Sequence, residues 1–203
     1  MEEGQTTIPD GFTDLAPGKI AAVTTYLEMR RPPVRSPIEP PAGFQLRSVN
    51  RPDPDWYREL FRTVGEAWLW YSRLQLNHDQ LIAILHDPRV DVFALEHAGR
   101  DQGLIELDRR QSPEIELAYL GLAPELIGQG LGRFLMGRAL EIAWSHHPSR
   151  VILHTCNLDH PRALAFYEKT GFVPYKRAIE VANDPRLTGA LPRTAAPQIP
   201  LID

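Results

Sequence analysis

The sequence contains a single cysteine, no excess of positive charge and no long apolar run. Cys156 has no second cysteine to pair with, so an internal disulfide is excluded. The net charge of −4 lacks the basic excess that phosphate binding requires, which argues against a nucleic-acid partner. Neither a span of about 20 apolar residues nor a basic-then-apolar start is present, so no membrane partner or secretory route is expected. These features predict a protein of the reducing cytoplasm.

Proline, in contrast, is abundant, with 19 residues among 203. The prolines concentrate in residues 31–41, 52–54 and 185–200. Because proline lacks a backbone donor and fixes its own φ angle, such stretches favour extended connectors over helices or central strands. The prolines therefore indicate where the regular structure begins and ends.

This distribution of prolines divides the chain into three parts. Residues 1–43 read as an N-terminal extension with a candidate edge strand at 19–29 and a proline-rich connector. Residues 44–182 should form one compact domain, and residues 183–203 a flexible tail. Since an exposed edge strand invites pairing, the extension is a candidate interface for a homodimer.

The hydrophobic pattern of the central part predicts an α/β fold of the α+β type. Strands joined by hairpins precede a strong amphipathic helix at 130–146, and a mixed but mostly antiparallel sheet of six or seven strands flanked by helices is expected. The further strands are predicted at 44–49, 90–96, 103–109, 114–122, 150–156 and 172–181. The further helices are predicted at 53–66, 77–86 and 160–170, the first behind Asp53 as N-cap and the last with Pro161 near its first turn.

A glycine-rich turn connects the strand at 114–122 to the helix that starts at residue 130. Gly128, Gly130 and Gly132 leave backbone N–H groups unobstructed at a helix N-terminus, which is a favourable seat for a pyrophosphate. No Gly-Lys-Ser/Thr follows, so a P-loop is excluded. A dinucleotide-binding unit is also disfavoured, because the turn comes late, after strands joined by hairpins. Glycines that serve packing alone are the weaker alternative.

The turn resembles the central motif of the GNAT superfamily of acyl-CoA-dependent N-acyltransferases. That motif is a strand ending in V-x-P-E or similar, followed by [QR]-x-x-G-x-[GA], and Leu122–Glu125 and Ile127–Gly132 take these places. Ile127 departs from the usual Gln or Arg. Because backbone N–H groups hold the phosphates, this change should weaken or reshape coenzyme binding rather than abolish it.

A second segment strengthens the resemblance. Asn157, Ala163, Tyr167 and Gly171–Phe172 match the family pattern N-x-x-A-x-x-x-Y-x-x-x-G-F, with three extra residues between Asn and Ala. The likeness covers residues 44–181 and implies a GNAT-like fold with acetyl-CoA as cosubstrate and no metal. The residues that it assigns to coenzyme binding are Leu120, Leu122, Gly128, Gln129, Gly130, Leu131, Gly132, Arg133 and Asn157.

The resemblance implies an N-acetyltransferase that moves an acetyl group from acetyl-CoA to a primary amine by direct transfer in a ternary complex. A backbone N–H near Leu122 would polarise the thioester carbonyl. Glu116 is the expected base, with Glu114 on the same strand face as the alternative. Tyr167 would protonate the leaving sulfur. The competing interpretation makes both glutamates solvated surface residues and Tyr167 a core residue.

The acceptor is expected to be a small-molecule or peptide amine. Trp68, Trp70 and Tyr71 precede the second helix, in a region that in this superfamily often lines the acceptor side, and aromatic rings suit an apolar or cationic body. His154 and Cys156 have no recognisable set of further metal ligands, so no metal is expected. The alternative function is a catalytically silent acyl-CoA-binding module, in which Glu116 and Tyr167 have only structural roles.

Overall fold

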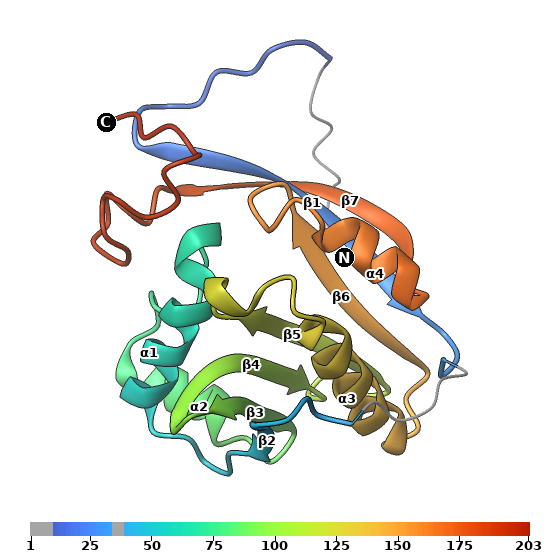
Figure 1. Ribbon diagram of the computed structural model, residues 1–203. Coiled ribbons are helices and arrows are strands. Elements are labelled where there is room, and N and C mark those ends of the chain that lie inside the picture. Colours follow the sequence, from blue (N-terminus) through green and yellow to red (C-terminus); the bar gives the residue numbers. More distant parts are fainter. Residues whose placement is uncertain (1–9, 34–38) are drawn as a thin grey trace.

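The computed structural model describes residues 10–33 and 39–203 and contains one seven-stranded sheet in the order β2-β3-β4-β5-β6-β1-β7 (Figure 1). All neighbours are antiparallel except β5 and β6. The strands are β1 (Lys19–Met29), β2 (Phe44–Ser48), β3 (Val90–His97), β4 (Arg100–Asp108), β5 (Glu114–Leu122), β6 (Arg150–Cys156) and β7 (Val173–Asn183). The helices are α1 (Pro54–Gly65), α2 (His78–Leu85), α3 (Leu131–Ser145) and α4 (Ala163–Thr170), with short 3₁₀ turns at Glu66–Trp68 and Pro124–Leu126. The predicted fold class is confirmed.

Local capping explains three of the helix boundaries. The side chain of Asp53 accepts hydrogen bonds from two first-turn amides of α1, and Asn77 forms a reciprocal capping box with Gln80 at the start of α2. Gly171 ends α4 in the left-handed conformation at φ 111°. The predicted start of α4 at residue 160 is wrong by three residues, because Pro161 lies in a turn before the helix.

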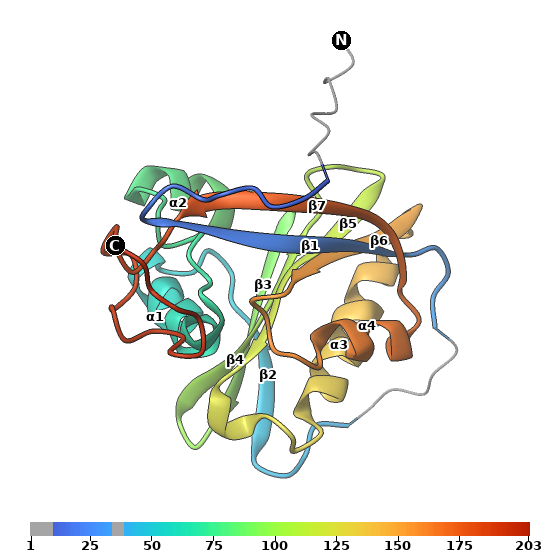
Figure 2. The same ribbon diagram turned by 90° about the horizontal axis from the view of Figure 1, so that it is seen from above.

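Helices cover both faces of the sheet. The helix α3 packs on one face and forms the main apolar core with β1, β3, β4, β5 and β6, while α1 and α2 cover the opposite face of β3 and β4 (Figure 2). Fully buried representatives of the first core are Leu27, Ile105 and Leu135, and of the second Tyr57 and Phe61. Within the described residues, no helix is long and apolar enough to cross a membrane.

The strand at 19–29 is not an edge strand, which corrects the sequence-based expectation. It lies between β6 and β7 and pairs with both, so that Thr24 is opposite Cys156 on one side and Ala178 on the other. The edge on this side of the sheet is β7. The sheet therefore begins within the N-terminal extension, while residues 1–9 and part of the proline-rich connector, 34–38, lie outside the described residues.

The C-terminal segment also packs against the domain instead of forming a free tail. Arg186 is buried, pairs with Asp184 at 2.7 Å and donates a 2.8 Å hydrogen bond to the carbonyl oxygen of Ile199. Leu191 belongs to an apolar cluster with Ile20 of β1. A buried guanidinium with several acceptors holds the segment in place, and composition alone does not reveal this.

Strands β5 and β6 pair only at their first residues. The parallel register runs from Glu114 opposite Arg150 to Glu116 opposite Ile152, after which β5 continues alongside β4 to Leu122. The divergence of two neighbouring strands leaves unpaired backbone and room for side chains between them. The gap between β5 and β6 lies at the centre of the sheet, beside the glycine-rich turn that follows β5.

Candidate active site

Two pockets meet where β5 and β6 diverge. One, the glycine-turn pocket, has a volume of about 490 Å³ and lies beside the start of α3, and the other, the aromatic pocket, has a volume of about 280 Å³ and lies between β5, β6, β1 and β7. Residues that line both pockets mark their junction: Trp68, Trp70, Leu120, Asp159 and Tyr167. Ligands bound in the two pockets could both contact these shared residues.

The glycine-turn pocket has the properties of an anion site. Gly128 and Gly130 have φ angles of 92° and 84°, and Gly130 caps α3 without any side-chain hydrogen bond to the helix. The first two amides of α3 therefore remain available to a ligand, with the positive end of the helix dipole behind them, while the amide of Arg133 donates to the carbonyl oxygen of Gly130. Arg133, Arg162 and Lys169 also line the pocket and add positive charge.

Most of the residues predicted to bind coenzyme line this pocket, and three do not. Those that do are Leu120, Leu122, Gly128, Gly130, Gly132 and Arg133. Gln129 turns its amide to the carbonyl oxygen of Glu125, and the side chain of Leu131 is buried in the main core. The side chain of Asn157 accepts a hydrogen bond of 2.6 Å from the amide of Val23 and lines neither pocket. In this chain Asn157 attaches β1 to the end of β6.

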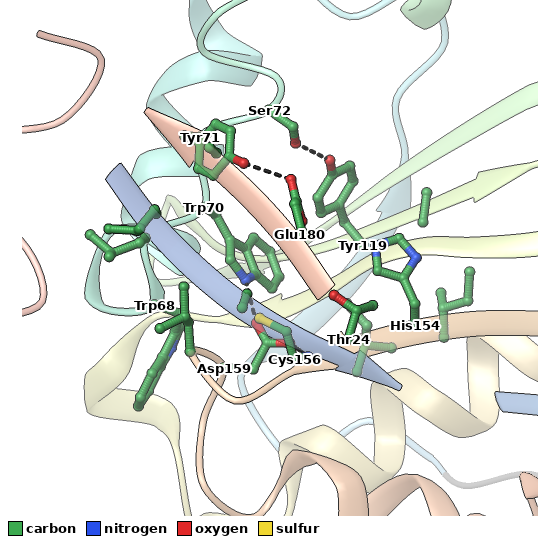
Figure 3. Close-up of a pocket in the computed structure, with 18 of the residues that line it drawn as sticks. Thr24, Trp68, Trp70, Tyr71, Ser72, Tyr119, His154, Cys156, Asp159 and Glu180 are labelled. Atoms are coloured by element: carbon green, nitrogen blue, oxygen red, sulfur yellow. Dashed lines mark hydrogen bonds between the residues drawn. The ribbon is translucent and has the colours of Figure 1, made fainter. Parts of the chain in front are cut away.

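The aromatic pocket contains the three predicted acceptor residues (Figure 3). Trp70 donates from its indole nitrogen to Asp159 at 2.8 Å, and Tyr71 donates from its hydroxyl to Glu180 at 2.7 Å. Trp68 lies at the junction, edge-on to the ring of His160. Gly65 makes this arrangement fit, because a Cβ atom there would lie 2.5 Å from the Cβ of Trp70.

Several other residues of the aromatic pocket were not predicted from the sequence to belong to the acceptor site. Tyr119, His154 and Glu180 come from β5, β6 and β7, and Thr24 comes from β1. The carboxylates of Asp159 and Glu180 line the pocket, and among the described residues that line it none is Lys or Arg. The charge of this pocket is thus opposite to that of its neighbour.

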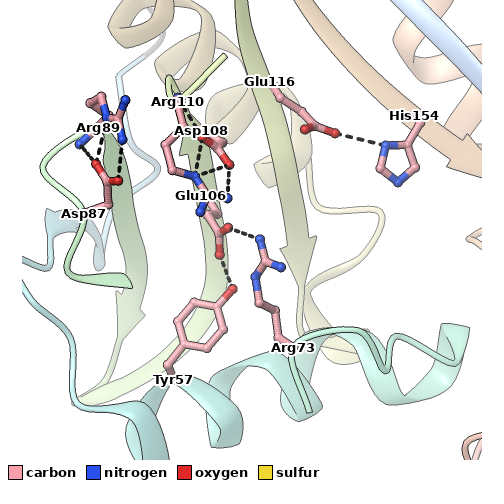
Figure 4. Close-up of polar contacts among 9 residues, drawn as sticks. All are labelled: Tyr57, Arg73, Asp87, Arg89, Glu106, Asp108, Arg110, Glu116 and His154. Carbon is pink, nitrogen blue, oxygen red and sulfur yellow. Dashed lines mark hydrogen bonds and ion pairs between the residues drawn. The ribbon is translucent and has the colours of Figure 1, made fainter. Parts of the chain in front are cut away.

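A buried ionic network supports the wall formed by Tyr119. Glu106 is fully buried and accepts hydrogen bonds from the hydroxyl of Tyr57 and from Arg73 (Figure 4). The guanidinium of Arg73 lies over the ring of Tyr119, 5.0 Å from its centre. The hydroxyl of Tyr119 is hydrogen-bonded to Ser72 at 2.5 Å. These contacts fix one side of the pocket through a network of buried polar groups.

Tyr167 lines both pockets from α4, as its predicted role requires. Burial raises the pKa of its hydroxyl well above the usual value, and the nearby charge of Asp159 adds to the effect. No hydrogen bond joins this hydroxyl to another of the described residues. The phenol therefore stays protonated at neutral pH and can donate a proton to a ligand at the junction.

The two candidate base residues differ in their partners. Glu114 is held by Arg150, with 2.6 Å between their side chains, whereas Glu116 contacts a residue of the aromatic pocket. Glu116 lies 3.1 Å from Nδ1 of His154 (Figure 4), and it is His154 that lines the aromatic pocket. The hydrogen bond with Glu116 raises the pKa of His154, although burial opposes the rise.

The remaining reactive group in the aromatic pocket is Cys156. Burial raises the pKa of its thiol to about 11, so the nucleophilic thiolate is scarce at neutral pH. Within the ranges that the structure describes, no group of three or more His, Cys, Asp or Glu side chains could hold a metal ion. The site geometry fits transfer between two bound ligands, one anionic and one cationic.

Comparison with known proteins gives the family. The sequence profile of the acetyltransferase (GNAT) family matches residues 53–172, more than half of the chain. The chain belongs to this family and is an acetyltransferase-type enzyme. The superfamily predicted from the glycine-rich turn and the Tyr167 segment is thus confirmed.

Two acetyltransferases of known activity match this chain over different shares of their own length. The spermidine N(1)-acetyltransferase of Vibrio cholerae is 27% identical over 145 residues, which are 66% of this chain and 82% of that protein. The mycothiol acetyltransferase of Jonesia denitrificans is 30% identical over 148 residues, 68% of this chain, but the match spans only 46% of that protein.

Solved structures show the same fold. A GCN5-related N-acetyltransferase from Sphaerobacter thermophilus matches with a TM-score of 0.62 and 12% sequence identity, over 82% of this chain and 52% of that one. A tandem GNAT protein from the clavulanic acid biosynthesis pathway matches with a TM-score of 0.56 and 19% identity, over 80% of this chain and 54% of that one. At such identities the likeness is one of fold.

Proposed function

We propose that this chain transfers an acetyl group from acetyl-CoA to a primary amine by direct transfer in a ternary complex. The observation that carries the proposal is the pair of pockets of opposite charge that share Leu120 and Tyr167. An anionic donor and a cationic acceptor would each find complementary charge, and their reacting ends would meet beside Tyr167.

The glycine-turn pocket fits the pyrophosphate of coenzyme A. The uncapped amides at the start of α3, the left-handed backbone at Gly128 and Gly130, and the side chain of Arg133 would hold its phosphates. The bound thioester supplies the activated acetyl group. The unpaired backbone of β5 around Leu120 and Leu122 provides N–H groups for the carbonyl oxygen, on which negative charge develops during attack.

Two side-chain roles complete the proposal. Tyr167 donates its phenolic proton to the departing sulfur, which its raised pKa and its position at the junction support. The proton of the acceptor ammonium leaves towards the wall of the pocket formed by His154, whose imidazole is in contact with Glu116. Direct transfer is favoured over an acyl-cysteine intermediate, because the thiol of Cys156 has a pKa of about 11.

The acceptor that suits the aromatic pocket is a small-molecule or peptide amine with a positively charged body. The rings of Trp70 and Tyr71 and the carboxylates of Asp159 and Glu180 all favour a cation. The Vibrio cholerae relative is a spermidine N(1)-acetyltransferase, and such an acceptor agrees with its activity.

Replacement of Tyr167 by Phe tests the assigned role of the phenol. Loss of a general acid should lower kcat by about 10²–10⁴-fold, while the dissociation constant for coenzyme A changes little because the ring remains. The assay is release of the free coenzyme thiol from acetyl-CoA across a panel of amines. Tyr175→Phe is the matched control, since Tyr175 lies on β7, is exposed and lines neither pocket. Unchanged kcat in Tyr167→Phe would remove Tyr167 from the mechanism.

A further inference from the structure

Glu116, the carboxylate expected to act as base, is separated from the aromatic pocket by His154. Glu116 is the last residue of β5 that pairs with β6, and its partner in the register is Ile152. Two residues further along β6, His154 presents the imidazole that lines the aromatic pocket, while Glu116 does not line it. The side chains meet at 3.1 Å, between Oε1 of Glu116 and Nδ1 of His154 (Figure 4).

We propose that His154, through its Nε2 atom, takes the proton from the acceptor amine, and that Glu116 is a positioning residue that orients this imidazole. The inference rests on the proposed acetyl transfer and assigns a further catalytic residue to it. Glu116 accepts the hydrogen bond from Nδ1–H and so selects the tautomer whose Nε2 carries a lone pair. No hydrogen bond joins Nε2 to another of the described residues, which leaves it available to the pocket.

The groups around His154 come from every strand packed against it. On β5 the neighbour is Glu116, on β1 the ring of Tyr26 lies 5.6 Å away, and on β7 Glu180 and Lys176 contribute charge, the latter over the ring of Tyr26. Asp159 adds a further negative charge from the segment after β6. Acidic neighbours outnumber the single lysine, in agreement with a raised pKa for His154.

A histidine is better matched to this task than a carboxylate. The ordinary pKa of a glutamate is about 4.3 and that of a histidine about 6.5, whereas an alkyl ammonium such as lysine has one near 10.4. Because the pKa of His154 is raised above its usual value, this imidazole accepts the ammonium proton with a smaller unfavourable step than a carboxylate does.

The step balances in protons and bonds. The ammonium gives one proton to Nε2, from which it passes to solvent, and the neutral nitrogen attacks the thioester carbon. As the C–N bond forms and the C–S bond breaks, the sulfur takes a proton from the phenol of Tyr167. The second proton lost by the amine nitrogen replaces the one that Tyr167 gave, so that the products are the amide, the coenzyme thiol and one released proton.

The test compares His154→Gln with Glu116→Gln in the pH dependence of amine-driven thiol release. We expect His154→Gln to lower kcat by at least about 100-fold and to remove the acidic limb of the profile. Glu116→Gln should retain more activity and shift that limb to lower pH, because the hydrogen bond that raises the pKa of His154 is weakened. His97→Gln is the control, since His97 stacks on Phe44 and lines neither pocket.

A second measurement distinguishes the loss of a base from a folding defect in the His154 variants. His154→Ala should regain thiol release when imidazole is added to the buffer, while coenzyme A affinity and the unfolding temperature stay near those of the wild type. Activity lost in Glu116→Gln but kept in His154→Gln would make Glu116 the base and overturn the inference alone. Absence of amine-dependent release from the wild type would overturn the proposed function, and the inference with it.

Discussion

Removal of the charge on Glu106 should be the most destabilising conservative change near the site. Glu106 is 0% exposed and Arg73, its partner at 2.6 Å, is 13% exposed, so Glu106→Gln leaves a guanidinium charge unpaired in the interior. Breaking a buried ion pair by removal of one partner costs about 3–5 kcal/mol. For a chain of this size, each kcal/mol corresponds to about 2–4 °C in unfolding temperature, which gives a decrease of about 6–20 °C.

The matched control is Asp108→Asn, two residues further along β4. Asp108 pairs with Arg110, whose side chain is 31% exposed, so solvent can compensate the lone charge and the loss should be about 1 kcal/mol. Thermal and urea unfolding followed by circular dichroism measure both variants. The double variant Arg73→Met, Glu106→Gln should recover part of the loss, because no unpaired charge remains. A Glu106→Gln variant as stable as Asp108→Asn would refute the reasoning.

Two further predictions concern the glycine-turn pocket and the C-terminal segment. Gly130→Ala should cost about 1–2 kcal/mol in stability, because φ at this position is 84°, and should weaken coenzyme A binding measured by calorimetry. Gly132→Ala should leave the unfolding temperature unchanged, since its Cβ would lie 3.9 Å from the nearest atom, in Phe166. Arg186→Met should expose residues 187–203 to limited proteolysis, because the backbone acceptors of the guanidinium, Ile199 among them, lose their donor; an unchanged digestion pattern would contradict that role.

The parts of the fold that could be predicted depend on local signals. Asp53 and Asn77 mark helix starts through capping, Gly171 marks a helix end, and the boundaries of β5 and β6 follow from turns and apolar runs. The position of β1 inside the sheet could not be predicted, because it depends on pairing with strands more than 120 residues later in the chain. Composition likewise gave no sign that Arg186 would be buried.

The candidate site also has parts that local sequence signals predict and parts that depend on contacts between distant segments. The glycine turn and Tyr167 lie in contiguous motifs, so their neighbourhood was predictable from the sequence. The aromatic pocket is assembled from four strands, the segments after α1 and after β6, and α4. The roles suggested for His154 and Glu180 depend on side chains that meet only in the folded chain. Asn157 illustrates the limit of a motif match, since its side chain is bonded to β1.

The central claim is that the two pockets hold acetyl-CoA and an amine at the same time. The most direct test is the release of coenzyme thiol from acetyl-CoA, measured with and without amines that range from neutral-bodied monoamines to diamines and triamines. The account predicts release that depends on the amine and is most efficient for acceptors with a second positive charge. Tight binding of coenzyme A without release from any amine would contradict it and would identify the chain as a catalytically silent acyl-CoA-binding module.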